Sequence, residues 1–119
     1  MIQPKFKTRL DYEKANILMQ PTFIRVVDNI RKAAESSEWE ISYREIEEPF
    51  PSYILSQKKG DKIIETNIWF ICFQVCFQNY QLDQSEPVEI DHKLINDQGE
   101  LDWHELEDKT QKLVQNIFQ

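Results

Sequence analysis

The sequence contains little glycine and no long apolar run, and each shortage excludes a class of protein. Two glycines in 119 residues leave almost no room for the glycine-rich loops whose backbone amides cradle phosphate groups. The longest uninterrupted apolar run is Ile68 to Phe73, whereas a membrane-spanning helix needs about 20 apolar residues. Residues 1–14 mix charged and apolar side chains and lack the apolar region of a secretory signal. We therefore expect a cytoplasmic protein without a transmembrane segment.

Cysteine is also scarce, because the chain has only Cys72 and Cys76. Their spacing differs from the C-x-x-C of zinc and redox motifs, and no second pair completes a zinc site. On the strand that we expect there, their Cα atoms would lie about 13 Å apart, beyond the reach of a disulfide. We expect two reduced, unpaired thiols, as a reducing compartment favours, with no metal and no cofactor.

Charge is distributed unevenly along the chain, whose formal net charge is −7. Residues 1–37 carry more bases than acids, whereas residues 83–108 contain Lys93 as their only base among many acids. Because phosphate backbones repel such an acidic segment, nucleic acid is not an expected ligand. The segment indicates either a solvated acidic surface or a binding site for a basic partner. Under the second interpretation, the binding residues are Glu86, Glu89 and Asp91.

The spacing of apolar residues predicts a single α+β domain over residues 1–119. It begins with an N-terminal helix whose N-cap is Asp11. Pro21 interrupts this helix, and we expect a kink or a restart there rather than an end. After Ser37 the apolar period changes from about 3.6 residues to about 2, which predicts a half-buried strand. Its inward side chains are Trp39, Ile41 and Tyr43.

Further strands should complete an antiparallel sheet of three to four strands. A second strand is expected over residues 53–57, followed by a turn at residues 58–61. Alternating apolar residues predict a third strand over residues 68–78. A helix is the rival interpretation there, but aromatic and β-branched side chains favour the strand. A short fourth strand is expected near residues 88–90.

The C-terminal helix has clear signals at its start. Residues 96–99 form a turn, and Asp102 with Glu105 three residues later is typical of a capping box. An apolar stripe then predicts that the helix packs on the sheet. The stripe consists of Leu106, Leu113, Val114, Ile117 and Phe118.

Few residues suggest chemistry. The segment after Leu94 resembles the back half of an EF-hand calcium loop, but Leu94 would occupy the first ligand position and has no side-chain oxygen. We therefore interpret it as a turn followed by a capped helix. His92 and His104 lie beside acids and could act as general bases. Neither a nucleophile elbow nor a metalloprotease motif accompanies them, so we assign no catalytic residue.

Three stretches of the chain carry a resemblance to known proteins: Arg9 to Lys14 with the following residues through Pro21, Gln74 to Tyr80, and Gly99 with Asp102 and Trp103. In combination they resemble a family of small conserved cyanobacterial proteins. The resemblance covers most of the chain and implies a cyanobacterial setting. It implies no activity and no site residues, and the connection over residues 45–52 is shorter here than in those relatives.

These observations favour a non-enzymatic interaction or accessory protein that holds another protein. Its contact surface would be the acidic end, a sheet edge, or an aromatic sheet face formed by Trp39, Tyr43 and Trp69. The alternative is a small apolar-ligand binding protein or enzyme with an aromatic pocket. An enclosed pocket would favour the alternative, and a flat exposed aromatic patch would favour the interaction protein. A homo-oligomer is compatible with both hypotheses.

Overall fold

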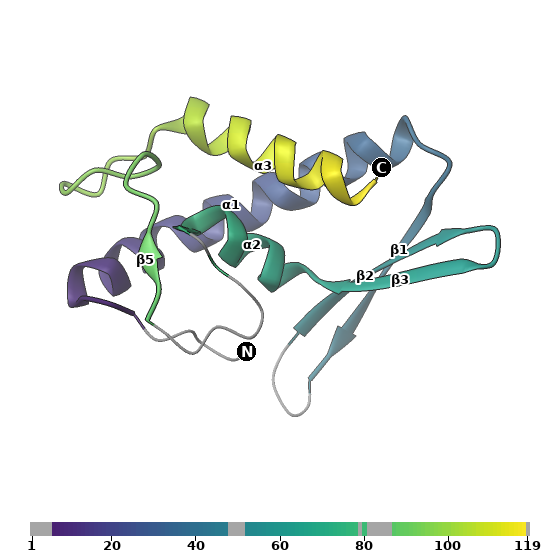
Figure 1. The fold of residues 1–119 in the computed structure, drawn as a ribbon, viewed down its shortest axis with the longest axis horizontal. Coiled ribbons are helices and arrows are strands. Elements are labelled where there is room, and N and C mark those ends of the chain that lie inside the picture. The colour runs from purple at the N-terminus through teal and green to yellow at the C-terminus, as the bar shows by residue number, and fades with distance from the viewer. Residues whose placement is uncertain (1–5, 48–51, 79, 81–86, 119) are drawn as a thin grey trace.

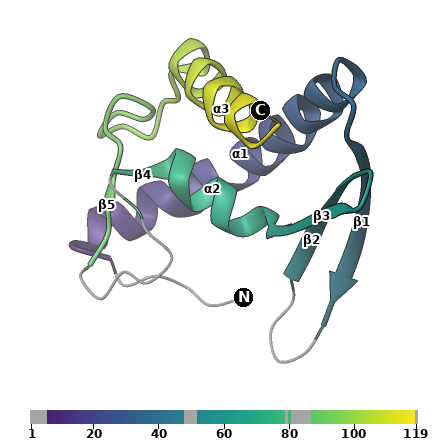
Figure 2. The same cartoon turned by 45° about the vertical axis from the view of Figure 1, so that its right-hand side comes forward.

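The computed structural model describes residues 6–47, 52–78, 80 and 87–118. Three helices lie together, and a three-stranded sheet projects from one side of them (Figure 1, Figure 2). The predicted α+β class, with an N-terminal helix, an antiparallel sheet and a C-terminal helix, is confirmed. In chain order the elements are α1 (Arg9–Glu35), β1 (Glu40–Ile46), β2 (Ser52–Lys59), β3 (Lys62–Asn67), α2 (Ile68–Cys76), β4 (Phe77–Gln78), β5 (Glu89–Ile90) and α3 (Trp103–Ile117). None of the helices in these described ranges is long and apolar enough to cross a membrane.

The N-cap of helix α1 lies three residues before Asp11, so the predicted cap is wrong. Thr8 is the N-cap, and its hydroxyl oxygen accepts a hydrogen bond from the backbone N–H of Asp11 at 3.1 Å. Asp11 instead occupies the first turn, where a carboxylate favours the positive end of the helix dipole. Pro21 lies inside the helix without ending it, as expected. Because proline has no N–H, it leaves the carbonyl of Ile17 without its usual intrahelical donor.

The first three strands form an antiparallel sheet in the order β1-β2-β3. The first two correspond to the predicted strands, and residues 48–51 between them lie outside the described residues. Lys59 pairs with Lys62, so the hairpin between β2 and β3 has a two-residue loop. Gly60 occupies its first position with φ of +60°, which a residue without a Cβ adopts at no steric cost.

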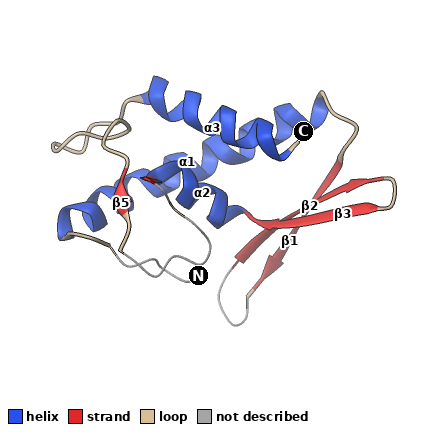
Figure 3. Ribbon diagram, in the orientation of Figure 1, coloured by secondary structure: helices blue, strands red, loops and turns tan. Residues whose placement is uncertain are grey.

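The predicted strand over residues 68–78 is wrong, because most of it is helix α2, followed by the two residues of β4 (Figure 3). The last pair between β2 and β3 joins Ile54 to Asn67. A longer β3 would soon run past the start of β2 at Ser52 and leave buried backbone groups unpaired. A helix satisfies those groups internally. The Asn67 side chain caps it by accepting a hydrogen bond from the N–H of Trp69 at 3.0 Å.

The predicted fourth strand is present but does not join the first sheet. Strand β5 pairs antiparallel with β4, so the two form a separate two-stranded ladder. This ladder follows α2 and lies beside the N-terminal half of α1 (Figure 2).

Helix α3 begins at the predicted cap. The Asp102 side chain accepts a hydrogen bond from the N–H of Glu105 at 3.1 Å. The buried side of the helix includes Leu106, Thr110 and Val114, and it packs on α1 and α2. The helix reaches the sheet at its C-terminal end, where the Gln57 amide donates a hydrogen bond to the carbonyl of Ile117 at 2.9 Å.

Both cysteines are free and buried, which agrees with the expectation of unpaired thiols. The separation of about 13 Å expected on a strand does not apply, because both cysteines lie on a helix. Residues four apart on a helix lie about one turn apart. Burial is what protects the thiols. It raises the pKa of Cys76 to about 12 and raises that of Cys72 as well. The Cys76 Sγ lies 3.4 Å from the Thr22 hydroxyl and 3.5 Å from the Met19 sulfur, against α1.

We predict that neither thiol reacts with Ellman's reagent at pH 8 in the native protein, because the thiolate is the nucleophile and burial disfavours it. After denaturation without reductant, both thiols should titrate. Fewer than two thiols in the denatured sample would show a disulfide, and prompt reaction of the native protein would show that α2 is not packed as described.

Candidate functional site

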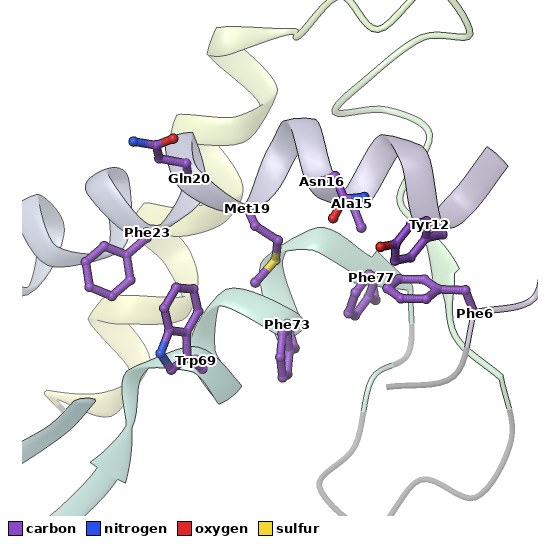
Figure 4. A pocket seen from close by; sticks show the side chains of 10 residues that line it. All are labelled: Phe6, Tyr12, Ala15, Asn16, Met19, Gln20, Phe23, Trp69, Phe73 and Phe77. Carbon is purple, nitrogen blue, oxygen red and sulfur yellow. The ribbon is translucent and has the colours of Figure 1, made fainter. Parts of the chain in front are cut away.

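A groove lies between α1 and α2 and has a volume of about 280 Å³. Figure 4 shows its side chains converging from the N-terminal half of α1, from α2 and from the segment before α1. Among the residues that the structure describes, no charged side chain lines it. The lining consists of Phe6, Tyr12, Ala15, Asn16, Met19, Gln20, Phe23, Trp69, Phe73 and Phe77.

Helical spacing places these side chains on common faces. On α1, Tyr12, Met19 and Phe23 are separated by seven and four residues, so they lie along one side of the helix. On α2, Trp69 and Phe73 are one turn apart, and Phe77 continues the row just past the end of the helix. The groove is therefore the space between two aromatic rows on facing helices.

The rings make many contacts with one another at both ends of the groove. At one end, the ring of Phe6 meets those of Tyr12 and Phe77 edge to face, with centroids 5.4 Å and 5.6 Å apart. At the other end, the rings of Phe23 and Trp69 lie 4.9 Å apart at 30°. Figure 4 shows Met19 between these two groups. A thioether adapts its shape easily, so the middle of the groove can adjust to an occupant.

Polar groups are confined to the edge of the groove. Asn16 and Gln20 are exposed residues of α1, and Tyr12 is 43% exposed. Figure 4 shows the Gln20 amide pointing away from the rings of Trp69 and Phe73. The interior thus offers apolar and aromatic contact, and the rim offers neutral hydrogen-bonding groups.

The three aromatic residues predicted to share a sheet face do not share one, because Trp69 belongs to α2. Trp69 lines the groove, and Tyr43 on β1 reaches it through intermediate rings. Tyr43 lies 5.5 Å from Tyr53, which lies 6.1 Å from Phe23, a neighbour of Trp69. Trp39 is separate and lies under the ammonium group of Lys59 at 5.8 Å.

The predicted acidic binding residues make contacts within the chain. Glu89 forms an ion pair with Lys7 at 3.6 Å, and its carboxylate also lies 3.3 Å from the Nε2 of His92. Asp91 accepts a hydrogen bond from the Lys109 ammonium group at 2.8 Å. Glu86 lies outside the described residues. A partner-binding role for these acids stays a prediction.

The predicted histidine candidates lie away from the groove. His92 is exposed, and its Nδ1 lies 3.2 Å from the Nζ of Lys14. The Lys14 side chain is only 3% exposed and forms an ion pair with Asp97 at 2.7 Å. This network connects α1 to the turn before α3. His104 is an exposed residue of the first turn of α3.

The EF-hand-like segment is a turn followed by a capped helix. The side-chain oxygen of Asn96 accepts hydrogen bonds from the N–H groups of Gln98 and Glu100, both at 3.0 Å. Gly99 has φ of +80°, and Leu94 is buried. Over the ranges that the structure describes, no three His, Cys, Asp or Glu side chains are grouped to hold a metal ion.

Most of the residues that line the groove were not predicted as site residues from the sequence. The α2 row of the groove was assigned to a strand, in which Trp69, Phe73 and Phe77 share one face of a sheet instead of one side of a helix that packs on α1. The signal was present in the four-residue spacing of these three aromatic residues, which also fits a helix. Phe6 and Tyr12 could be placed only by knowing how α1 and α2 pack.

We predict that Asp91→Asn lowers the free energy of unfolding at pH 7 by about 1–2 kcal/mol, because the Lys109 ammonium group loses its ionised partner. Burial raises the pKa of Asp91, but hydrogen bonds from Lys109 and the Lys93 backbone, with the two lysine charges, lower it overall. A lowered pKa stabilises the folded state above the unfolded pKa of about 3.9 and loses that effect as the pH falls through the folded value. The difference between wild type and variant should therefore shrink below about pH 4 in urea denaturation.

The matched control is Asp108→Asn, because Asp108 is an exposed acid whose lysine partner lies 3.9 Å away. It should change the stability by less than about 0.5 kcal/mol. Equal effects of the two variants at pH 7, or a constant difference for Asp91→Asn across the pH range, would contradict the assignment.

Comparisons of the chain with protein-family models, with curated proteins and with solved structures find no match. The resemblance to small cyanobacterial proteins accordingly stays a prediction. The groove between α1 and α2, with its uncharged aromatic lining, is the feature on which a functional proposal can rest.

Proposed function

We propose that the protein binds a small, uncharged, aromatic or apolar compound in the groove between α1 and α2. The observation that supports this is the lining, which has six aromatic side chains and Met19 but no charged group. Ligand sites are typically concave and mostly apolar, with a few polar groups that fix orientation. Here Asn16 and Gln20 at the rim would supply those groups.

The volume limits the size of the ligand. An apolar cavity of about 150 Å³ holds benzene, and pockets for drug-sized compounds begin at about 300 Å³. At about 280 Å³ the groove suits a compound of about two aromatic rings. Each favourable ring contact contributes about 0.5–1.5 kcal/mol beyond the burial of apolar area.

The lining also selects against charge. An ion that enters an apolar groove loses its hydration, and it needs a nearby counter-ion to compensate. In the described part of the chain, no lysine, arginine, aspartate or glutamate is among the lining residues. We therefore expect neutral compounds to bind more tightly than charged analogues of the same shape.

The same geometry supports binding over catalysis. The candidate general bases, His92 and His104, are not among the residues that line the groove. The thiols of α2 are also absent from the lining, and burial raises the pKa of each. In the alternative, an accessory protein, the groove would hold an apolar side chain of a partner protein. A free small compound would then compete with that side chain for the groove.

We predict that N-phenyl-1-naphthylamine, an uncharged fluorescent probe, binds the native protein saturably and transfers energy from Trp69. Its 8-sulfonate analogue carries the same rings and one negative charge. It should bind at least about tenfold more weakly, because no cation is among the described residues that line the groove. Fluorescence titration of both probes at equal ionic strength measures the difference.

Two variants locate the binding. Ala15→Leu adds bulk to the groove wall and should raise the Kd of the neutral probe by about tenfold or more. The matched control is Ala34→Leu, the same change on the same helix at a position outside the lining, which should leave the Kd unchanged. Should Ala15→Leu fail to fold, Gln20→Glu tests the rim of the groove instead, because its negative charge should weaken binding of the sulfonate probe further. Equal Kd values for both probes, or no effect of either groove variant, would overturn the proposal.

A further inference from the structure

The outer edge of β3 has hydrogen-bonding groups and apolar side chains without a neighbouring strand in the described part of the chain. The sheet order β1-β2-β3 makes β3 an edge strand. Figures 1 and 2 show its hairpin projecting away from the helices. Ile63 is 62% exposed and Ile64 is 44% exposed. An edge of this kind is a template for another strand unless charge or proline protects it.

The hairpin loop determines which residues of β3 face outward. In a two-residue hairpin the pair next to the loop exchanges hydrogen bonds, and hydrogen-bonded and non-hydrogen-bonded pairs then alternate. Lys62 and Ile64 therefore direct their N–H and C=O groups toward Lys59 and Gln57 of β2. Ile63 and Glu65 direct theirs away from β2, toward the open edge.

We infer that β3 pairs antiparallel with β3 of a second copy of this chain. In the register that we propose, Ile64 lies opposite Ile64 of the other copy on the two-fold axis. Ile63 then lies opposite Glu65 in both directions, so the residues with outward groups form the hydrogen-bonded pairs. The Ile64 side chains meet as a non-hydrogen-bonded pair, in which side chains approach most closely.

Charge selects this register over its neighbours. A shift by two residues in one direction would place Asp61 opposite Glu65, and a shift in the other would place Glu65 opposite Glu65. Like charges directly opposite each other are destabilising. In the proposed register no charged residue of β3 faces a like charge, because Lys62 lies opposite Thr66.

The charges beside the edge also complement each other. Lys58 pairs with Ile63 on β2, so in the assembly it lies two strands from Glu65 of the other copy and on the same face. A basic side chain already spans that separation in this sheet, because Arg44 on β1 forms an ion pair with Glu65 on β3. The opposite edge strand, β1, exposes Glu40, Arg44 and Glu45. Strand β3 exposes Lys62 and Glu65, with Ile63 and Ile64 exposed between them.

The test is the oligomeric state between 10 and about 500 µM by sedimentation equilibrium, with charged variants at Ile64. Wild type should show a concentration-dependent dimer. Ile64→Lys and Ile64→Glu should each raise the dimer Kd by about tenfold or more, since each places like charges side by side. An equimolar mixture of the two variants should regain the dimer, because among antiparallel registers only this one sets residue 64 opposite residue 64.

The matched control is Ile24→Lys, because Ile24 is a 59% exposed isoleucine on α1, away from the sheet. It should leave the dimer Kd unchanged, and far-UV circular dichroism should show all variants folded. A wild type that stays monomeric up to the highest concentration would overturn the proposal. So would a dimer that survives both Ile64 variants, one that Ile24→Lys disrupts equally, or a mixture that stays monomeric.

Discussion

The burial of α2 is the constraint on which the rest of the structure depends. A helix that is apolar on nearly every side has to be covered, and six of its nine residues are buried. It contacts α1, α3, β2, β3 and β4, so the helices and both ladders meet around it. Because a helix satisfies its own backbone hydrogen bonds, it can occupy this interior position at a place where an unpaired strand could not. The protected thiols and one wall of the groove follow directly from its position.

Helix α1 separates the polar contacts of the fold from the groove. On one side of the helix, Lys14 pairs with Asp97, and Asn29 and Arg25 both bind Glu107, which connects α1 to the turn before α3 and to α3 itself. A different side presents Tyr12, Met19 and Phe23 to α2. The charged groups that fix the helix in place therefore lie away from the groove, and the lining remains neutral. Under the proposed function, this separation favours neutral ligands, because an ion in the groove would lose its hydration without gaining a counter-ion.

The sequence was informative where local signals agree and failed where they conflict. The turn at Gly60 and the cap at Asp102 were predicted, because each has a residue with a specific backbone role. Residues 68–76 form a helix although many of their side chains favour strands. Burial in the folded protein overrides that intrinsic preference. The hairpin could have corrected this prediction, because its register runs out of β2 partners near Ser52. Trp69 was predicted on a sheet face, but it lines the groove. The side chains of α1 that face it could be identified only from the packing of α1 on α2.

The groove and the edge of β3 use different residues but meet at Asn67. Strand β3 ends there and α2 begins at the next residue, without an intervening loop. The Asn67 side chain holds the first turn of α2 through the N–H of Trp69, whose ring lines the groove. A second strand along β3 would cover the backbone from Lys62 to Thr66 and would stop just before this cap. The edge can therefore be occupied while the groove stays open, and a strand that orders β3 also restrains the residue from which the groove wall starts.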